Sequence, residues 1–268
     1  MLARLKQSLL DYFVLRPTRH PIDSTGARRE YAELSKGKIE FFVQHHGMSK
    51  APTELLVLKF PGTAGRAERG SLFPASCITE VHTKIWTWNP PGYGQSEGKS
   101  TLPVIANSAL DFFNYALSEH DQDLPIWLVG NSLGCLSALH IASAIDQNHY
   151  RLGVILRNPP DLIRVVKNVA RKYPFGFAVD GVAESLCDAM NVCLTAPRCT
   201  APAFFLQSEF DTLVPRRLQD QIIEIYGGDY RKLVLSGLEH DGKLQPMHYP
   251  SINSGIQWLW SQTNQDKF

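Results

Sequence analysis

Ser132 is the residue whose type and surroundings best suit nucleophilic chemistry. It lies in the stretch GNSLG (130–134), between an apolar run that predicts a strand and another that predicts a helix. Glycines on both sides let strand and helix pass close to each other, so the turn would hold the serine oxygen exposed at its tip. Because a serine hydroxyl is a weak nucleophile at neutral pH, it needs a base beside it.

Histidine suits the role of that base, because its pKa lies close to neutral pH. His240 lies in the loop GLEHDG (237–242), directly after the last predicted strand. His248 lies in the same C-terminal region and is the alternative base. We predict that His240 is the residue that takes the proton from Ser132.

A carboxylate is expected to orient the imidazole and to stabilise its charged form. Asp211 lies in the turn after the predicted strand at 202–208, where the chain turns into the next helix. Glu209 is the alternative acid, and Asp241 is a weaker one. The preferred residues occur in the chain order serine, aspartate, histidine, which is known for enzymes that carry their nucleophile on a strand-to-helix turn.

Attack by a serine on a carbonyl group creates a negatively charged oxygen, which needs hydrogen-bond donors. The main-chain N–H of Leu133, directly after the predicted nucleophile, is the first candidate donor. The loop FPGTAG (60–65) follows an earlier predicted strand, and Gly62 lets its backbone turn sharply. We therefore predict the N–H of Thr63 as the second donor of this oxyanion hole.

The elements that must position these residues are short apolar runs alternating with helical segments. The runs predict strands at 38–46, 54–60, 84–89, 125–130, 152–158, 202–208 and 231–236. Helical patterns cover 102–120, 133–145, 216–226 and 254–262. This alternation predicts an α/β fold with a mostly parallel sheet and helices on both faces. The three predicted catalytic residues follow strands, so they would meet at the carboxyl edge of the sheet.

One interval, residues 159–200, is longer than a simple crossover between two strands requires. It contains helix-like pieces, and we predict that it forms a small helical cap on a single domain spanning 1–268. Most of its apolar side chains would fill the cap's own core, and a few would line a pocket for an acyl chain. Tyr93, in the glycine-rich loop after the strand at 84–89, is predicted to add a wall to that substrate pocket.

Five motifs in sequence order resemble those of the α/β-hydrolase fold serine hydrolases. GNSLG is similar to the family's nucleophile turn, and FPGTAG resembles its oxyanion loop, with Pro61 in place of the usual histidine. SEFDTLVP (208–215) and GLEHDG resemble the acid and histidine loops. NPPGYGQSEG (89–98) resembles the loop after the third strand, without the charged residues of an internal ion pair. DYFVLRPTRHP (11–21) also resembles the Bem46-like branch.

This resemblance implies a serine hydrolase that cleaves a carboxylic ester or thioester through an acyl-enzyme, without a cofactor. The expected partner is a small acyl substrate. A serine peptidase of the same fold is one alternative, and a ligand-binding homologue without catalytic activity is another. Epoxide hydrolases and dehalogenases are disfavoured, because related enzymes of those classes carry aspartate at the position of Ser132.

Charge and cysteine content bear on the expected partner, the cellular setting and the presence of a metal site. The chain has 27 basic and 26 acidic residues, for a formal charge of +1, and this balance argues against a nucleic-acid partner. Five widely spaced cysteines do not resemble a disulfide framework, so a cytoplasmic setting is expected. Cys187, Cys193 and Cys199 recur every six residues, but no CxxC pair or nearby histidine supports a metal site.

The N-terminal stretch MLARLKQSLLDYFVLRP (1–17) could be mistaken for a signal peptide. Asp11 interrupts its apolar run, and no small-residue cleavage site follows. Leu2, Leu5, Leu9 and Phe13 recur at helical spacing, which predicts an amphipathic helix. Packing on the domain and peripheral contact with a membrane surface are both open for this helix.

Overall fold

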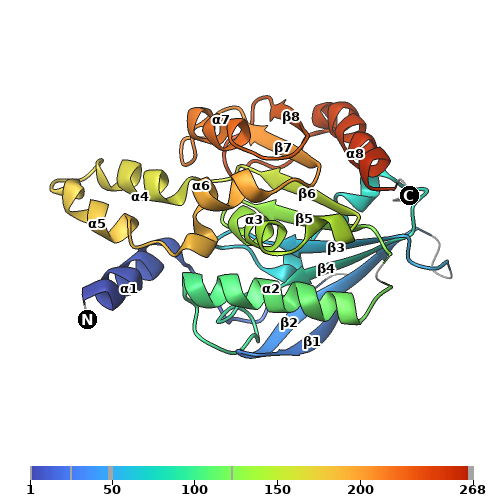
Figure 1. The fold of residues 1–268 in the computed structure, drawn as a ribbon, viewed down its shortest axis with the longest axis horizontal. Helices are drawn as coiled ribbons and strands as arrows, with labels where there is room; N and C mark the ends of the chain where they lie inside the picture. The colour runs from blue at the N-terminus through green and yellow to red at the C-terminus, as the bar shows by residue number, and fades with distance from the viewer. Residues whose placement is uncertain (1, 25, 48–50, 122, 265–268) are drawn as a thin grey trace.

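A mixed eight-stranded sheet runs through the computed structural model, which describes residues 2–24, 26–47, 51–121 and 123–264 (Figure 1). The strand order is β1-β2-β4-β3-β5-β6-β7-β8. The strands are β1 (Arg28–Leu34), β2 (Gly37–His46), β3 (Leu55–Phe60), β4 (Thr83–Trp88), β5 (Ile126–Asn131), β6 (Leu152–Arg157), β7 (Ala203–Ser208) and β8 (Tyr230–Leu235). β2 pairs antiparallel with β1 and with β4, and all the other pairs are parallel.

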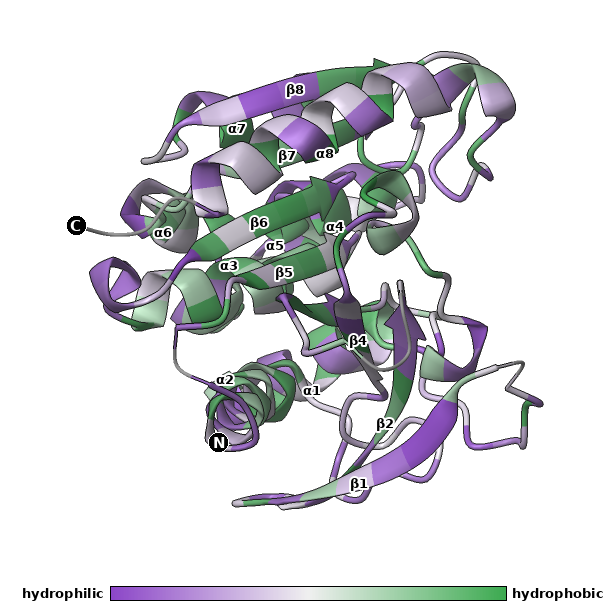
Figure 2. Ribbon diagram, turned by 90° about the vertical axis from the view of Figure 1, so that its right-hand side faces the viewer, coloured by the Kyte–Doolittle hydropathy of each residue, from purple (hydrophilic) through white to green (hydrophobic). Residues whose placement is uncertain are grey.

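The edge strand β1 is absent from the sequence prediction. Its sequence is RREYAEL, in which Ala32 is the only buried residue, so no apolar run marks it. Its pairing with β2 places Arg29 beside the buried Glu40 of β2, and the two form an ion pair of 2.8 Å. A charged edge strand of this kind also discourages pairing with other chains. Figure 2 shows the hydrophilic character of β1 against the hydrophobic β5.

From β4 onward, α-helices alternate with the strands, as the sequence predicts. The α-helices are α1 (Leu2–Val14), α2 (Leu102–Ser118), α3 (Gly134–Ala144), α4 (Leu162–Ala170), α5 (Asp180–Ala183), α6 (Val192–Thr195), α7 (Arg216–Glu224) and α8 (Tyr249–Thr263). The 3-10 helices are η1 (Ala67–Arg69), η2 (Ala75–Cys77), η3 (Gln147–His149), η4 (Gly176–Val179), η5 (Asp188–Met190), η6 (Ala196–Arg198) and η7 (Pro246–His248). No described helix is both long and apolar enough to cross a bilayer.

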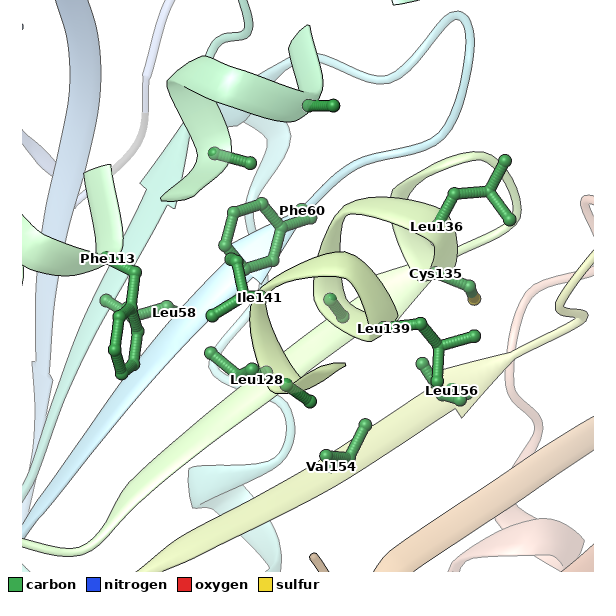
Figure 3. Packing of buried hydrophobic residues seen from close by; sticks show 14 of the residues in the cluster. Leu58, Phe60, Phe113, Leu128, Cys135, Leu136, Leu139, Ile141, Val154 and Leu156 are labelled. Atoms are coloured by element: carbon green, nitrogen blue, oxygen red, sulfur yellow. The ribbon is translucent and has the colours of Figure 1, made fainter. Parts of the chain in front are cut away.

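Two layers of apolar side chains hold helices against the opposite faces of the sheet. On one face α1, α2, α3 and α7 contribute to a single large cluster. Within it, Leu139 of α3 lies beside Leu156 of β6, and Ile141 of α3 lies beside Phe60 of β3 (Figure 3). On the other face, α8 packs its buried side chains against β6, β7 and β8. The central strands are therefore buried on both faces, which fixes the position of the loops that follow them.

The helix α8 begins five residues before its predicted start at residue 254. Its first turn contains Tyr249 and Pro250, and proline is well tolerated there because the first N–H groups of a helix have no partner in the helix. The apolar spacing that identifies the helix starts only at Ile252, which is fully buried. The predicted range 254–262 therefore contains several buried residues of α8 but misses its first turn and the buried Ile252.

The interval 159–200 forms a series of short helices between β6 and β7. The first, α4, is a regular helix of nine residues, capped at its start by the side chain of Asp161. After α4, the helix-like part of the interval is broken into α5, η5 and α6. Leu186 and Met190 of this interval are buried in the cluster that also holds α3. Figure 1 shows α4 and α5 extending beyond the sheet at the end where α1 also lies.

Candidate active site

Ser132 lies at a strained turn between β5 and α3. Its backbone φ angle is 50°, in the left-handed region that residues with a side chain rarely adopt. The flanking glycines make this turn possible, because a Cβ on Gly134 would overlap the carbonyl oxygen of Phe60, and one on Gly130 would lie 2.5 Å from the Cα of Cys135. The turn is fixed to the next strand by a hydrogen bond of 2.8 Å from the N–H of Ser132 to the oxygen of Arg157.

His240 links the other two predicted residues. Its Nε2 lies 2.9 Å from Oγ of Ser132, and its Nδ1 lies 2.6 Å from Oδ2 of Asp211. The three residues come from the loops after β5, β7 and β8, at the carboxyl edge of the sheet. The Asp211 side chain is inaccessible to solvent, whereas the imidazole is 12% exposed. This arrangement can carry a proton from the hydroxyl to the imidazole while the carboxylate holds the ring in orientation.

The carboxylate of Asp211 is held on both of its oxygens. Its Oδ1 accepts hydrogen bonds from the N–H groups of Leu213 (3.0 Å) and Val214 (2.7 Å). Its Oδ2 faces His240 and also accepts a longer bond of 3.4 Å from the buried amide of Gln219. Three donors from its own loop and helix therefore leave Asp211 one orientation, in which it faces the imidazole.

The alternative acids and base have other partners in the structure. The carboxylate of Glu209 accepts a hydrogen bond of 2.8 Å from the N–H of Gly237, and Asp241 is exposed. His248 is buried and lies 2.8 Å from the oxygen of Ser236 through its Nε2. It also accepts the N–H of Gln245 through Nδ1. The geometry favours Asp211 and His240 over these alternatives.

The loop 60–65 contacts the turn that carries Ser132. A Cβ built on Gly62 would lie 3.3 Å from the Cβ of Ser132, so only glycine fits at this distance without displacement. Within the described part of the chain, the main-chain N–H groups of Thr63 and Leu133 donate no hydrogen bond to a protein acceptor. Both therefore remain available as donors to a bound ligand, as an oxyanion hole requires.

Tyr93 supports the loop 60–65 through a hydrogen bond to its main chain. The residue is almost fully buried, and its hydroxyl donates a hydrogen bond of 2.8 Å to the main-chain oxygen of Thr63. The same hydroxyl accepts the N–H of Arg16, which connects the loop to the segment after α1. The structure thus assigns Tyr93 a supporting place, and its contact with a substrate stays a prediction.

Asn89 replaces a charged residue in the motif of similar enzymes, and the structure shows what the amide does. It is fully buried, donates to the carboxylates of Glu40 (2.6 Å) and Glu68 (3.0 Å), and accepts the N–H of Ala67 (2.9 Å). Burial by itself raises the pKa of Glu68, but hydrogen bonds from Asn89 and Arg66 outweigh it and hold that pKa below its usual value. The amide thus joins β2, β4 and the segment after the Thr63 loop.

Asn158, directly after β6, is a positioning residue that sequence reasoning missed. It is fully buried, has a φ angle of 52°, and accepts the N–H of Ser208 at 2.8 Å. Its side-chain amide donates to Oγ of Ser208 and to the main-chain oxygen of His240, both at 3.0 Å. Its neighbour Arg157 donates to the main-chain oxygen of Gly242. These partners are 50 or more residues away in the chain, so no local pattern identifies them.

Among the residues that the structure describes, the cysteines and other potential metal ligands form no recognisable metal centre. All five cysteines are free thiols, and the thiol pKa of Cys135, behind the nucleophile turn, is raised by burial. Within residues 2–24, 26–47, 51–121 and 123–264, no group of three or more His, Cys, Asp or Glu side chains is placed to hold a metal ion.

Comparison with solved structures identifies the architecture, although no family model and no curated protein sequence gives a significant match. Est1E from Butyrivibrio proteoclasticus, solved with ferulic acid, matches with a TM-score of 0.64 and 16% identity over 88% of this chain and 100% of its own. An esterase from Pyrococcus furiosus matches with a TM-score of 0.68 and 14% identity over 94% and 98%. An alpha-beta hydrolase from Vibrio vulnificus matches with a TM-score of 0.65 and 18% identity over 94% and 86%.

The chain has the α/β-hydrolase fold. Two observations support this assignment. The strand order places β4 between β2 and β3, and the solved structures match most of the chain. Within this fold, Ser132 occupies the turn after β5, Asp211 follows β7 and His240 follows β8. The Bem46-like branch is not addressed by these matches and stays a prediction.

Proposed function

We propose that this α/β-hydrolase is a serine hydrolase that cleaves carboxylic esters or thioesters through an acyl-enzyme. The observation that carries the proposal is the hydrogen-bonded chain from Ser132 through His240 to Asp211, beginning at a strained turn. Esterases among the structural neighbours support the reaction class, since they share the sheet on which this chain is built. Its free cysteines support a cytoplasmic setting.

In the proposed reaction, Oγ of Ser132 attacks the carbonyl carbon while Nε2 of His240 accepts the hydroxyl proton. The negative charge that develops on the carbonyl oxygen is stabilised by the N–H groups of Thr63 and Leu133. The protonated imidazole, held by Asp211, then donates its proton to the leaving alcohol or thiol. Water attacks the acyl-enzyme in the second half, and His240 accepts a proton from it before returning one to Ser132.

The decisive test is covalent labelling with a fluorophosphonate, which reacts with activated serines. We expect one adduct per chain, located at Ser132 by peptide mass spectrometry, and hydrolysis of p-nitrophenyl esters that Ser132→Ala abolishes. Ser143→Ala, on the helix behind the nucleophile, is the matched control and should keep full labelling. A folded protein without an adduct would indicate a ligand-binding homologue, and a strong preference for amino-acid amides over esters would indicate a peptidase.

A further inference from the structure

The helix α1 presents an unusual amount of apolar surface to solvent. Its buried face is anchored by Leu10 and Val14, and the buried Asp11 accepts a hydrogen bond of 2.9 Å from the N–H of Leu102. The opposite side is apolar as well, since the exposed residues at helical spacing are Leu2, Leu5, Leu9, Tyr12 and Phe13. Two of these side chains, Leu2 at 65% and Tyr12 at 77%, are largely accessible to solvent. This stripe contributes nothing to the core of the domain.

A second exposed apolar surface lies in the cap, between α4 and α5. Tyr173, Phe175 and Phe177 occur within five residues, and the two phenylalanines are 78% and 68% exposed. Phe175 also has a φ angle of 60°, in the left-handed region that residues with a side chain rarely adopt. The turn needs Gly176, because a Cβ there would overlap the oxygen of Ala170. Folding of the cap therefore explains the glycine and leaves the aromatic side chains without a structural role.

The two surfaces lie at the same end of the molecule. The helix α1 packs against α5, where a Cβ on Gly181 would lie 3.1 Å from Nζ of Lys6. The cap loop 171–178 leads through η4 directly into α5. Figure 1 shows α1 and the turn between α4 and α5 projecting together beyond the sheet. An extended partner could contact both surfaces at once.

The exposed charges within the two surfaces, in residues 2–19 and 171–178, are positive, and the nearby carboxylates of Asp180 and Glu184 pair with Arg171 and Lys167. Arg171 and Lys172 are exposed immediately before the aromatic residues, and Arg4 and Arg16 are exposed on or next to α1. Arg171 pairs with Asp180 at 3.0 Å, but no described carboxylate forms an ion pair with Arg4, Arg16 or Lys172. The only carboxylate of residues 2–19 is the buried Asp11. A second copy of the chain would bring like charges together, whereas an anionic bilayer complements them.

We propose that the stripe of α1 and the cap loop 171–178 dock this protein on an anionic lipid surface. The helix lies in the plane of the headgroups, with its exposed leucines and Phe13 toward the acyl chains, and the aromatic residues of the loop insert beside it. The unpaired cations contact the lipid phosphates and carboxylates. Docking depends on the surface alone and is independent of the chemistry proposed for Ser132.

The test is co-sedimentation of the full chain with vesicles of phosphatidylcholine, with and without 30% phosphatidylserine. We expect binding to the anionic vesicles that weakens at high salt and little binding to the neutral ones. Two pairs of substitutions, Phe175→Ser with Phe177→Ser and Leu5→Ser with Leu9→Ser, should each weaken binding at least tenfold. Charge reversal by Arg4→Glu with Lys172→Glu should also weaken it at least tenfold.

Met247→Ser is the matched control, because Met247 is 70% exposed but precedes α8, which covers the other face of the sheet. It should bind vesicles like the unaltered protein, and circular dichroism checks that each variant is folded. The cap variants decide the outcome if substitutions in α1 impair folding. The proposal is overturned if the unaltered chain binds neither kind of vesicle, or if the cap pair binds as well as Met247→Ser. Self-association that the cap pair abolishes, without vesicle binding, would assign the surface to a second copy.

Discussion

Asn158 donates a hydrogen bond of 3.0 Å from its side-chain amide to the main-chain oxygen of His240. The bond joins the end of β6 to the loop after β8, across the intervening strand β7. The residue has a left-handed backbone, which asparagine tolerates better than most residues with a side chain. The position of the imidazole therefore depends on an amide that does not touch either Ser132 or Asp211.

Asn158→Gly removes the side-chain amide that bonds to His240, while glycine adopts the same φ angle. The variant therefore tests the hydrogen bond without adding backbone strain. We expect ester turnover to fall roughly 10–100-fold at nearly unchanged KM, since a small displacement of a catalytic group can cost about that much. Ser208→Ala removes the other acceptor of the same amide and should have a far smaller effect on kcat. Equal losses of kcat in the two variants would show that the hydrogen bond to His240 has no special importance for turnover.

The orienting carboxylate can be tested with a pair of substitutions two residues apart. Asp211→Asn should lower kcat about 10⁴-fold while the protein stays folded, because the neutral amide no longer stabilises the imidazolium. Glu209→Gln should change kcat little, because Glu209 accepts the N–H of Gly237 instead. Steady-state kinetics on one ester substrate decide between them, and the reverse ranking would identify Glu209 as the acid.

The strain at Ser132 should be measurable as stability. Ser132→Gly and Ser132→Ala both remove the nucleophile, so both are expected to be inactive. Glycine adopts the φ angle of 50° freely, whereas alanine does not, so Ser132→Gly should be more stable by about 1 kcal/mol. Urea unfolding of the two variants measures this difference, and a less stable glycine variant would contradict it.

Lys59 on β3 should make stability depend on pH. Burial lowers its pKa to about 8, and its ammonium donates to the main-chain oxygens of Ser71 (2.6 Å) and Phe73 (2.9 Å). Between pH 8 and its ordinary value of 10.5, the unfolded chain binds the proton that the folded chain has lost, so stability rises with pH. The slope for one proton is at most about 1.4 kcal/mol per pH unit.

The comparison for Lys59 is with Lys59→Met, which cannot titrate. The free energy of unfolding, measured in urea from pH 7 to 10, should rise for the unaltered chain relative to this variant. Taking the difference cancels the titration of all other groups. Parallel pH profiles for the unaltered chain and Lys59→Met would disprove the prediction.

Substrate length is the fifth test. The cap carries apolar side chains beyond those it exposes, including Val165, which packs with Val214 and Leu218 near Asp211. If cap side chains line an acyl pocket, each methylene buried adds about 0.8 kcal/mol. We expect kcat/KM to rise from acetyl to short and medium acyl esters by roughly tenfold for two carbons, without activation by metal ions. Equal kcat/KM from acetyl to octanoyl esters would rule out such a pocket.

Local patterns were enough to predict the fold and the three residues that the structure joins. The strands β5, β6 and β7 are short apolar runs, so their bounds agree with the prediction to within one residue at each end. Because loops after parallel strands share one edge, chain order alone placed Ser132 beside His240. The sequence analysis did not predict the charged strand β1 or the role of the Asn158 amide. Both depend on partners from other segments, which become visible only in the folded chain.

The cap shows a different limit. Phe175 and Phe177 were expected among side chains that seal the cap or face a pocket, yet both are exposed. Hydrophobicity in a sequence predicts burial against something, but it does not distinguish the chain's own core from an outside surface. Their exposure, 78% for Phe175 and 68% for Phe177, is what separates these residues from an ordinary core pair, and no sequence pattern reveals it.

The end of β6 has a mechanical consequence for the site. The oxygen of Arg157 accepts the N–H of Ser132, and the next side chain holds the oxygen of His240. The nucleophile turn and the histidine loop are thus held by two consecutive residues, Arg157 at the end of β6 and Asn158 directly after it. A substitution or a bound molecule that shifts this strand end would therefore act on both groups at once. The two groups between which the proton moves, 2.9 Å apart, thus share one support.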